Sequence, residues 1–246
     1  MCTLVVLRRP DAAWPLLLAA NRDELRGRPS RAPGRHWPDR PHVRGGLDLE
    51  AGGTWLGVND DGIVAAVLNR RGTLGPQPGK RSRGELVLEA LDHAEAYHAA
   101  EALRGLDPAA WRPFNLVVAD AVDAFWLRHA GDGRVAARPI PDGVHMIEAG
   151  ELDDPASPRI ARFLPQFRFV EAPDPAGGDW SAWQALLAAR ASPTGDPRDA
   201  MCIVSEGEYG TVSSALLALP RHVTEPPVYL HADGRPGEIG FQRVPV

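Results

Sequence analysis

Alternating apolar and polar residues in the first seventy positions predict two β-hairpins, because a half-buried strand repeats every two residues. The paired runs are 3–7 with 14–20, and 54–58 with 63–68. Charged residues with proline or glycine separate the two runs of each pair and favour turns. Between the hairpins, the segment 26–46 has six arginines and four prolines without a clear period. We therefore expect a long surface loop there.

A different spacing appears after Ser82, where apolar residues recur every three or four positions. This pattern predicts a helix over about 83–104 with Ser82 at its N-cap, and similar patterns predict helices at 157–167 and 180–190. Further strands are expected at 114–119, 124–129, 135–140, 144–147, 201–204, 211–219, 228–231 and 239–243. Hairpins interrupted by a few helices predict an α+β fold with antiparallel sheets. No domain boundary is visible, so we expect residues 1–246 to form a single domain.

Charge and composition exclude several classes of function. The net charge of −5 gives no positive field to attract nucleic acid or an anionic membrane, so neither is an expected partner. No apolar run approaches the roughly 20 residues of a transmembrane helix, and no secretory signal is recognisable. Two cysteines provide no disulfide framework, and the eight histidines show no metal-ligand spacing. We expect a cytoplasmic protein without a bound metal.

The most informative chemistry lies at the start of the chain, at Cys2. A small second residue favours removal of the initiator methionine, so we expect a mature chain that begins at Cys2. A free α-amino group has a pKa of about 7.7–8.0 and a thiol one of about 8.5. An N-terminal cysteine therefore carries a nucleophile and a general base on the same residue. The alternative is an inert thiol at the start of a strand.

Polar residues that follow the apolar strands are candidates to assist Cys2. The first hairpin places the end of its second strand beside the start of its first, so Arg22 and Asp23 are expected within reach of the thiol. We predict that Asp23 orients the α-amine and that Asn69, at the end of the neighbouring hairpin, holds the oxyanion. For Asn69 the alternative is an ordinary turn residue.

A second group of residues is predicted to bind the substrate. Arg22 is expected to position a substrate carboxylate or to support Asp23, and Asn21, Glu24 and Trp55 complete the predicted pocket. The alternatives are a solvated turn for the polar residues and a core position for Trp55. The arginines of the 26–46 segment are chemically suited to a carboxylate, a phosphate or a haem propionate, or form a solvated loop.

Several motifs occur in order along most of the chain. They are Cys2, Asn21-Arg22-Asp23-Glu24, Gly53-Thr54-Trp55-Leu56-Gly57-Val58-Asn59, Ser82-Arg83-Gly84 and Pro113-Phe114-Asn115-Leu116-Val117-Val118-Ala119-Asp120. Together they resemble the NRDE family, also called the transport and Golgi organisation protein 2 family. The resemblance implies the N-terminal-nucleophile hydrolase fold, a four-layer αββα sandwich of antiparallel sheets.

A more distant similarity links the chain to choloylglycine hydrolases and penicillin V acylases, which cleave non-peptide amides. It places their nucleophile at Cys2, their aspartate at Asp23 and their oxyanion-hole asparagine at Asn69. The chain departs from these patterns at Ala20, where those enzymes have an arginine. It also departs at two positions where the NRDE pattern has an asparagine and an arginine, namely Ala149 and Val212.

We predict hydrolysis of a small-molecule amide through an N-terminal cysteine nucleophile. The alternative is a protein without turnover that binds haem or another small ligand in the same pocket, because members of this family are implicated in moving haem. Haem iron is normally ligated by His, Cys, Met or Tyr. Cys2 or a loop histidine is the candidate ligand.

Overall fold

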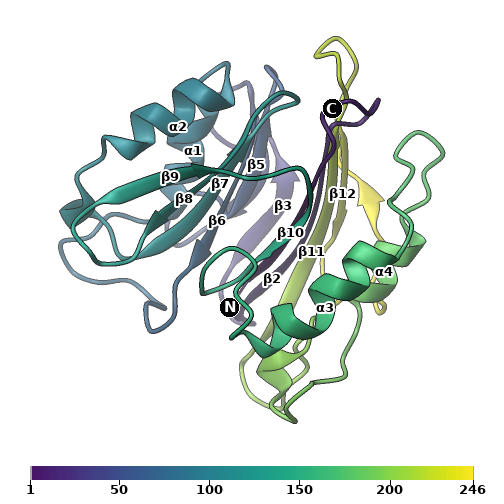
Figure 1. The fold of residues 1–246 in the computed structure, drawn as a ribbon. Helices are drawn as coiled ribbons and strands as arrows, with labels where there is room; N and C mark the ends of the chain where they lie inside the picture. The colour runs from purple at the N-terminus through teal and green to yellow at the C-terminus, as the bar shows by residue number, and fades with distance from the viewer. Residues whose placement is uncertain (1, 246) are drawn as a thin grey trace.

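A computed structural model describes residues 2–245 and contains two antiparallel β-sheets packed face to face between helices (Figure 1). The six-stranded sheet has the order β10-β1-β2-β11-β12-β13, and the seven-stranded sheet runs in sequence order from β3 to β9. The strands of the first sheet are β1 Thr3–Arg8, β2 Leu16–Leu25, β10 Gly143–Ile147, β11 Tyr209–Leu219, β12 Val228–Ala232 and β13 Gln242–Arg243. Those of the second are β3 Ser30–Gly34, β4 Val43–Asp48, β5 Leu56–Asn59, β6 Val64–Asn69, β7 Phe114–Ala119, β8 Ala124–His129 and β9 Val135–Pro139.

Helices cover the outer face of each sheet. In Figure 1, α1 and α2 lie on the seven-stranded sheet at the left, and α3 and α4 lie on the six-stranded sheet at the right. The α-helices are α1 Gly84–Leu91, α2 Ala96–Arg104, α3 Pro158–Phe169 and α4 Ser181–Leu187, and two short 3-10 helices span Pro108–Ala110 and Pro197–Asp199. The layers follow the order helix, sheet, sheet, helix. This confirms the predicted α+β sandwich.

Strand alternation divides the core into three layers. In β1, Leu4 and Val6 face the second sheet, whereas Val5 and Leu7 pack under α3 and α4. A third apolar layer joins α1 and α2 to the outer face of the seven-stranded sheet. Residues of one strand therefore reach either the space between the sheets or the space under the helices.

The first hairpin forms as predicted, with Thr3 opposite Asn21, but its second strand is longer than the apolar run. β2 continues to Leu25 because β11 pairs along its whole length, with Thr211 opposite Asp23. The polar tetrapeptide 21–24 is therefore part of a central strand and not a turn. The ladder is interrupted by a bulge at Val212.

Three other predictions about the chain path were wrong. The 26–46 segment contains β3 and most of β4, and β4 pairs with β5 to extend the sheet. The predicted helix over 83–104 is two helices, because the Asn59 side-chain amide binds the carbonyl oxygens of Leu91 and His93 and ends α1 there. The segment 201–204 is not a strand, since Ile203 donates its N–H to the Thr211 hydroxyl at 2.8 Å.

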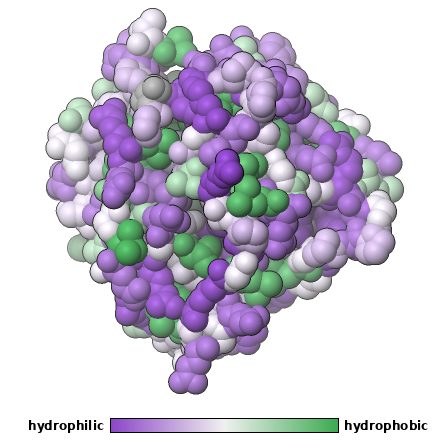
Figure 2. Space-filling view, turned by 180° about the vertical axis from the view of Figure 1, so that it is seen from behind, coloured by the Kyte–Doolittle hydropathy of each residue, from purple (hydrophilic) through white to green (hydrophobic). Residues whose placement is uncertain are grey.

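The surface seen in Figure 2 carries hydrophobic residues in small patches separated by hydrophilic ones. Such scattered apolar residues are normal for a folded surface. Within residues 2–245, no helix has both the length and the apolar character needed to cross a membrane.

Candidate active site

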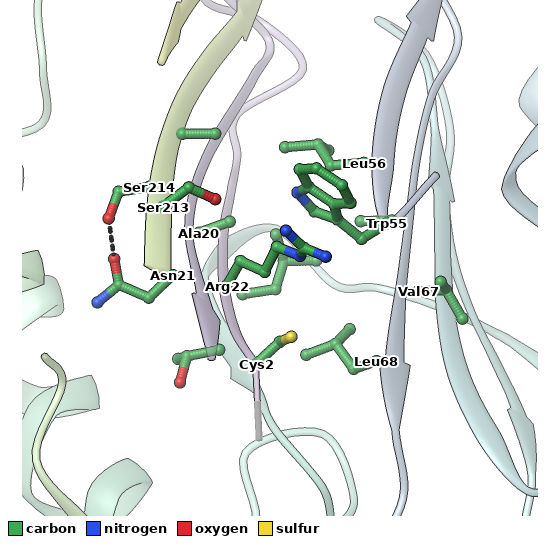
Figure 3. A pocket seen from close by; sticks show the side chains of 14 residues that line it. Cys2, Ala20, Asn21, Arg22, Trp55, Leu56, Val67, Leu68, Ser213 and Ser214 are labelled. Atoms are coloured by element: carbon green, nitrogen blue, oxygen red, sulfur yellow. Dashed lines mark hydrogen bonds between the residues drawn. The ribbon is translucent and has the colours of Figure 1, made fainter. Parts of the chain in front are cut away.

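A narrow cavity lies between the two sheets, beside the start of β1 (Figure 3). The space among its lining atoms, open mouth included, is about 350 Å³, of which about 20 Å³ is wide enough for a water molecule. Its wall is mostly apolar and includes Leu4, Leu56, Ala66, Leu68 and Ala215. Cys2, Arg22 and Trp55 supply polar or aromatic groups. A bound molecule here would contact hydrocarbon on most sides and a thiol and a guanidinium at one end.

The Cys2 side chain points into the space between the sheets (Figure 3). Its thiol lies 3.9 Å from the backbone carbonyl oxygen of Asp23, to which it donates a weak hydrogen bond. Burial raises the pKa of the Cys2 thiol, whereas the nearby charge of Arg22 acts in the opposite direction. The thiol form is thus favoured, and activation requires a base that accepts its proton.

Arg22 stacks on Trp55 in the wall of the cavity. The guanidinium carbon lies 3.8 Å from the ring centroid, and Nη1 donates to the Ser30 hydroxyl at 2.9 Å. Cation–π contacts of this kind hold a guanidinium with its plane fixed. The Trp55 ring in turn fits against Gly46, where an added Cβ would lie 2.3 Å from ring atoms. Glycine on β4 therefore allows the indole, and with it Arg22, to occupy this position.

The Asp23 carboxylate lies on the opposite face of the sheet from the cavity. Oδ1 accepts a hydrogen bond from the Thr211 hydroxyl at 2.7 Å, and Oδ2 accepts one from Arg159 Nη1 at 3.2 Å. The Asp23 and Arg159 side chains are both fully buried. Burial raises the pKa of the Asp23 carboxyl, and the charge of Arg159 opposes that rise.

Arg159 connects this carboxylate to the beginning of β1. Its Nη1 also donates to the Thr3 hydroxyl, Nη2 donates to the Arg198 carbonyl oxygen, and Nε lies 3.7 Å from Glu148 Oε2. The hydroxyl of Thr3 and the carboxylate of Asp23 therefore share one guanidinium. This arrangement fixes the carboxylate beside the residue that follows Cys2.

Because side chains alternate along β2, the four polar residues 21–24 point to different faces of the sheet. Asn21 borders the cavity, but its amide points away from it, donating to the Leu187 and Met201 carbonyl oxygens at 3.0 and 2.8 Å (Figure 3). Its carbonyl oxygen accepts from the Ser214 hydroxyl at 2.6 Å. These bonds tie β2 to α4 and β11 and give the Asn21 side chain a structural role, while its predicted contact with a substrate stays a prediction.

Glu24 and Asn69 line neither the cavity at Cys2 nor the adjoining polar cavity that Arg26 and Arg31 line. Glu24 Oε1 accepts the backbone N–H of Leu25 at 2.9 Å, so the structure does not bring its carboxylate into the predicted pocket. Asn69 is the last residue of β6 and lies opposite Phe114, one position beyond Leu68, which does line the cavity. Its role in holding an oxyanion stays a prediction.

The two departures from the family pattern occupy distinct places. Ala149 is buried, and its carbonyl oxygen accepts the N–H of Arg71 at 3.1 Å. Val212 lies at the bulge of β11 and lines a second cavity. Neither side chain offers a polar group to Cys2.

The second cavity adjoins the first and is strongly polar. The space among its lining atoms, open mouth included, is about 580 Å³, of which about 220 Å³ is wide enough for a water molecule. Arg22, Trp55 and Ser213 line both cavities, so both spaces border the stacked guanidinium. The other lining residues are Leu25, Arg26, Arg28, Ser30, Arg31, Val212, His231 and Asp233.

The buried partner Arg159 was not predicted from the sequence, although a signal for it exists. Arg159 lies four positions before Phe163 and eight before Phe167, both of which face the core from α3. A charged residue on the apolar face of a helix is rarely buried without a partner. The identity of that partner, 136 residues away in the sequence, is visible only in the folded chain.

The four-layer fold, with a cysteine at the start of a central strand, defines a protein with the N-terminal-nucleophile hydrolase fold. A Caenorhabditis elegans ortholog of N-acylethanolamine-hydrolyzing acid amidase superposes with a TM-score of 0.63 at 11% identity, covering 99% of this chain and all of that one. A mutant of conjugated bile acid hydrolase from Clostridium perfringens superposes with a TM-score of 0.53 at 12% identity, covering 100% and 97% of the two chains.

Sequence comparison then assigns the family. The sequence model described as "Transport and Golgi organisation 2" matches residues 1–172, and the chain belongs to this family. A mouse Transport and Golgi organization 2 homolog is 45% identical over 84 residues, and a human homolog is 38% identical over 116. The aligned parts cover 32% and 44% of this chain. They span only 29% of the mouse protein and 40% of the human protein.

Proposed function

We propose that the protein hydrolyses a non-peptide amide, with Cys2 as the nucleophile. The observation that carries this proposal is the position of the Cys2 thiol in the cavity between the sheets, while a buried carboxylate is fixed beside the start of the same strand. The two superposed structures are those of an amidase and of a hydrolase of conjugated bile acids. Their fold therefore supports amide chemistry in this chain.

The reaction begins after removal of Met1, which leaves Cys2 with a free α-amine. The amine accepts the thiol proton, and the sulfur attacks the carbonyl carbon of the amide. The C–N bond then breaks, the leaving amine takes the proton, and a thioester remains on Cys2. Water attacks the thioester, with the α-amine as general base, and releases the carboxylic acid and the thiol.

Asp23 is proposed as the residue that positions the α-amine. Its carboxylate is fixed by Thr211 and Arg159, and the guanidinium also holds the Thr3 hydroxyl. A carboxylate placed in this way favours the protonated amine that forms during attack. Asn69 remains the proposed oxyanion donor, which requires its amide to turn toward the mouth beside Leu68.

Covalent labelling tests the proposal directly. An electrophilic β-lactam is incubated with the purified protein, and the adduct is located by peptide mass spectrometry. We expect acylation of Cys2 in the wild type, none in Cys2→Ala, and strongly slowed acylation in Asp23→Asn. Asp61→Asn, which changes an exposed turn residue in the same way, serves as the matched control and should label normally. Normal labelling of Asp23→Asn would refute the assigned role.

The arginine-lined cavity supports a second candidate, a carrier of haem without turnover. His231 lines this cavity, and burial lowers the pKa of its imidazole, which favours the neutral form that ligates iron. The neighbouring arginines are chemically suited to haem propionates. Haemin titration would produce a Soret shift that His231→Ala abolishes; a wild-type protein without any shift refutes the carrier.

A reducing compartment is the proposed location. Cys2 and Cys202 are both free, and Cys202 is fully buried. Free thiols persist in the cytoplasm, where disulfides are rare. Tagging the protein at its C-terminus and fractionating cells tests this; recovery with secreted proteins would contradict it.

A further inference from the structure

We propose that the arginine-lined cavity binds the anionic group of the substrate, so that the protein acts on amides that join an apolar acyl chain to an amine bearing a carboxylate or phosphate. This inference rests on the proposed function and specifies its substrate class. The charged end would occupy the second cavity, and the amide would lie beside Cys2, with the acyl chain along the apolar residues at the mouth of the first cavity. Arg22, Trp55 and Ser213 line both cavities, so the two sites are adjacent and the charged end of a substrate would lie close to Cys2.

Charge is the first observation behind this assignment. Arg22, Arg26, Arg28 and Arg31 line the second cavity, and Asp233 is the carboxylate among its lining residues. The whole chain carries a net charge of −5, so this is a local concentration of positive charge against the overall sign. A cleft lined by one sign of charge concentrates ligands of the other sign.

The pairing of these arginines is the second observation. Arg28 is already neutralised, because its Nη2 lies 2.8 Å from Asp48 and its Nη1 lies 2.9 Å from Glu50. Among the described residues, no carboxylate forms an ion pair with Arg22 or Arg26. Arg22 bonds a hydroxyl and Arg26 bonds the Ser205 carbonyl oxygen. Both charges thus lack an acidic partner.

Burial makes this unpaired charge at Arg22 significant. The residue is only 5% exposed, and burial lowers the pKa of its guanidinium. A buried charge without a counter-charge is costly, and proteins normally pair it. An anionic group in the second cavity would supply that counter-charge. Guanidinium groups bind carboxylates and phosphates through two parallel hydrogen bonds, which also fixes the orientation of the ligand.

Arg31 provides the residue with which to test the site. It lies on β3 at the exposed edge of the cavity and forms no ion pair with another described residue. Its replacement therefore leaves no buried group without a partner. Arg138, exposed on β9 of the same sheet and likewise without an ion pair among the described residues, is the matched control for an equal change in net charge.

Binding is measured by calorimetry with Cys2→Ala protein, so the result does not depend on turnover. The probes are N-octanoylglycine, N-octanoyl-O-phosphoethanolamine and the neutral N-octanoylethanolamine. We expect at least one anionic probe to bind roughly tenfold or more tightly than the neutral one, since hydrogen bonds to charged groups are worth this much. Whichever anionic probe binds more tightly identifies the charged group as a carboxylate or a phosphate.

The variants then locate the effect. Arg31→Glu should weaken binding of the anionic probe by roughly tenfold, Arg138→Glu should change it less than about twofold, and Asp233→Asn should strengthen it. Equal affinity for anionic and neutral probes, or equal losses in the two arginine variants, would overturn the proposal. If anionic probes bind as expected but β-lactam labelling of Cys2 fails, the anion site stands and the hydrolase function falls.

Discussion

Replacing Arg159 with methionine tests the buried pair that fixes Asp23. Methionine keeps much of the side-chain volume but removes the guanidinium that contacts the carboxylate. The two charged groups are 3.2 Å apart and fully buried. At that separation, an effective dielectric constant of about 20 gives roughly 5 kcal/mol of attraction. Removing one partner of a buried pair costs about 3–5 kcal/mol in measured cases.

Urea unfolding followed by circular dichroism measures this loss. For an m-value of roughly 3 kcal/mol/M, the midpoint of Arg159→Met should fall by about 1–1.7 M. The matched control is Arg168→Met on the same helix, half exposed and paired with Asp153, which should lose less than about 1 kcal/mol. Adding Asp23→Asn to Arg159→Met should restore part of the stability, because the buried negative charge that Arg159 balanced is then absent. Equal losses for Arg159→Met and Arg168→Met would refute the reasoning.

The loss should also depend on pH. Burial raises the folded-state pKa of Asp23, and Arg159 opposes that rise. With a raised folded pKa, the native state holds the proton more tightly than the unfolded chain does. The stability that protonation of the Asp23 carboxyl contributes is therefore complete below the ordinary carboxyl pKa near 4. It is lost as the pH rises through the folded-state pKa of Asp23. Without Arg159 that pKa rises further, so the destabilisation of Arg159→Met should be larger at about pH 8 than at about pH 5.

Three other changes test the surroundings of the cavity. Gly46→Ala places a Cβ 2.3 Å from the Trp55 ring and should cost about 1–3 kcal/mol and shift the tryptophan emission; an unchanged spectrum and midpoint would contradict this packing. Asn115→Ala removes amide bonds to the Glu148 and Gly150 carbonyl oxygens at 2.9 and 2.8 Å, which join the two sheets, and should lower stability by about 2 kcal/mol in urea unfolding. Iodoacetamide should alkylate Cys2 before Cys202, because Cys202 is the more buried of the two. Alkylation of Cys2 should become faster at higher pH, because burial raises the pKa of its thiol. Peptide mapping that finds Cys202 modified first would contradict this order.

The local pattern predicted most of the strands, but it missed β3 and β4, placed a strand at 201–204 where there is none, and did not show how far β2 extends. An apolar run ending at position 20 marks the part of the strand covered by hydrophobic neighbours. Pairing with β11 carries the strand on to Leu25. The same period of two implied that Arg22 and Asp23 point to opposite faces. The prediction placed both within reach of the Cys2 thiol; Arg22 shares the cavity with the thiol, whereas Asp23 approaches it through its backbone carbonyl oxygen.

Contacts between residues far apart in the sequence explain most of the features that could not be predicted. The split between α1 and α2 depends on Asn59, which is 32 residues from the carbonyl oxygen that it binds in α1. β3 and β4 lack a period of two in their sequence because proline and glycine interrupt it. They are defined by backbone pairing, of β4 with β5 and of β3 with β4. No local propensity encodes such contacts.

The central claim is that Cys2 becomes the first residue of the working protein and supplies both sulfur and amine. The most direct measurement is the intact mass of the protein, purified after co-expression with a methionine aminopeptidase. The account predicts a chain that lacks Met1 and begins at Cys2. A protein that retains Met1 and is nonetheless acylated by the β-lactam at Cys2 would contradict it, because the α-amine of Cys2 would then be an amide nitrogen unable to accept the thiol proton.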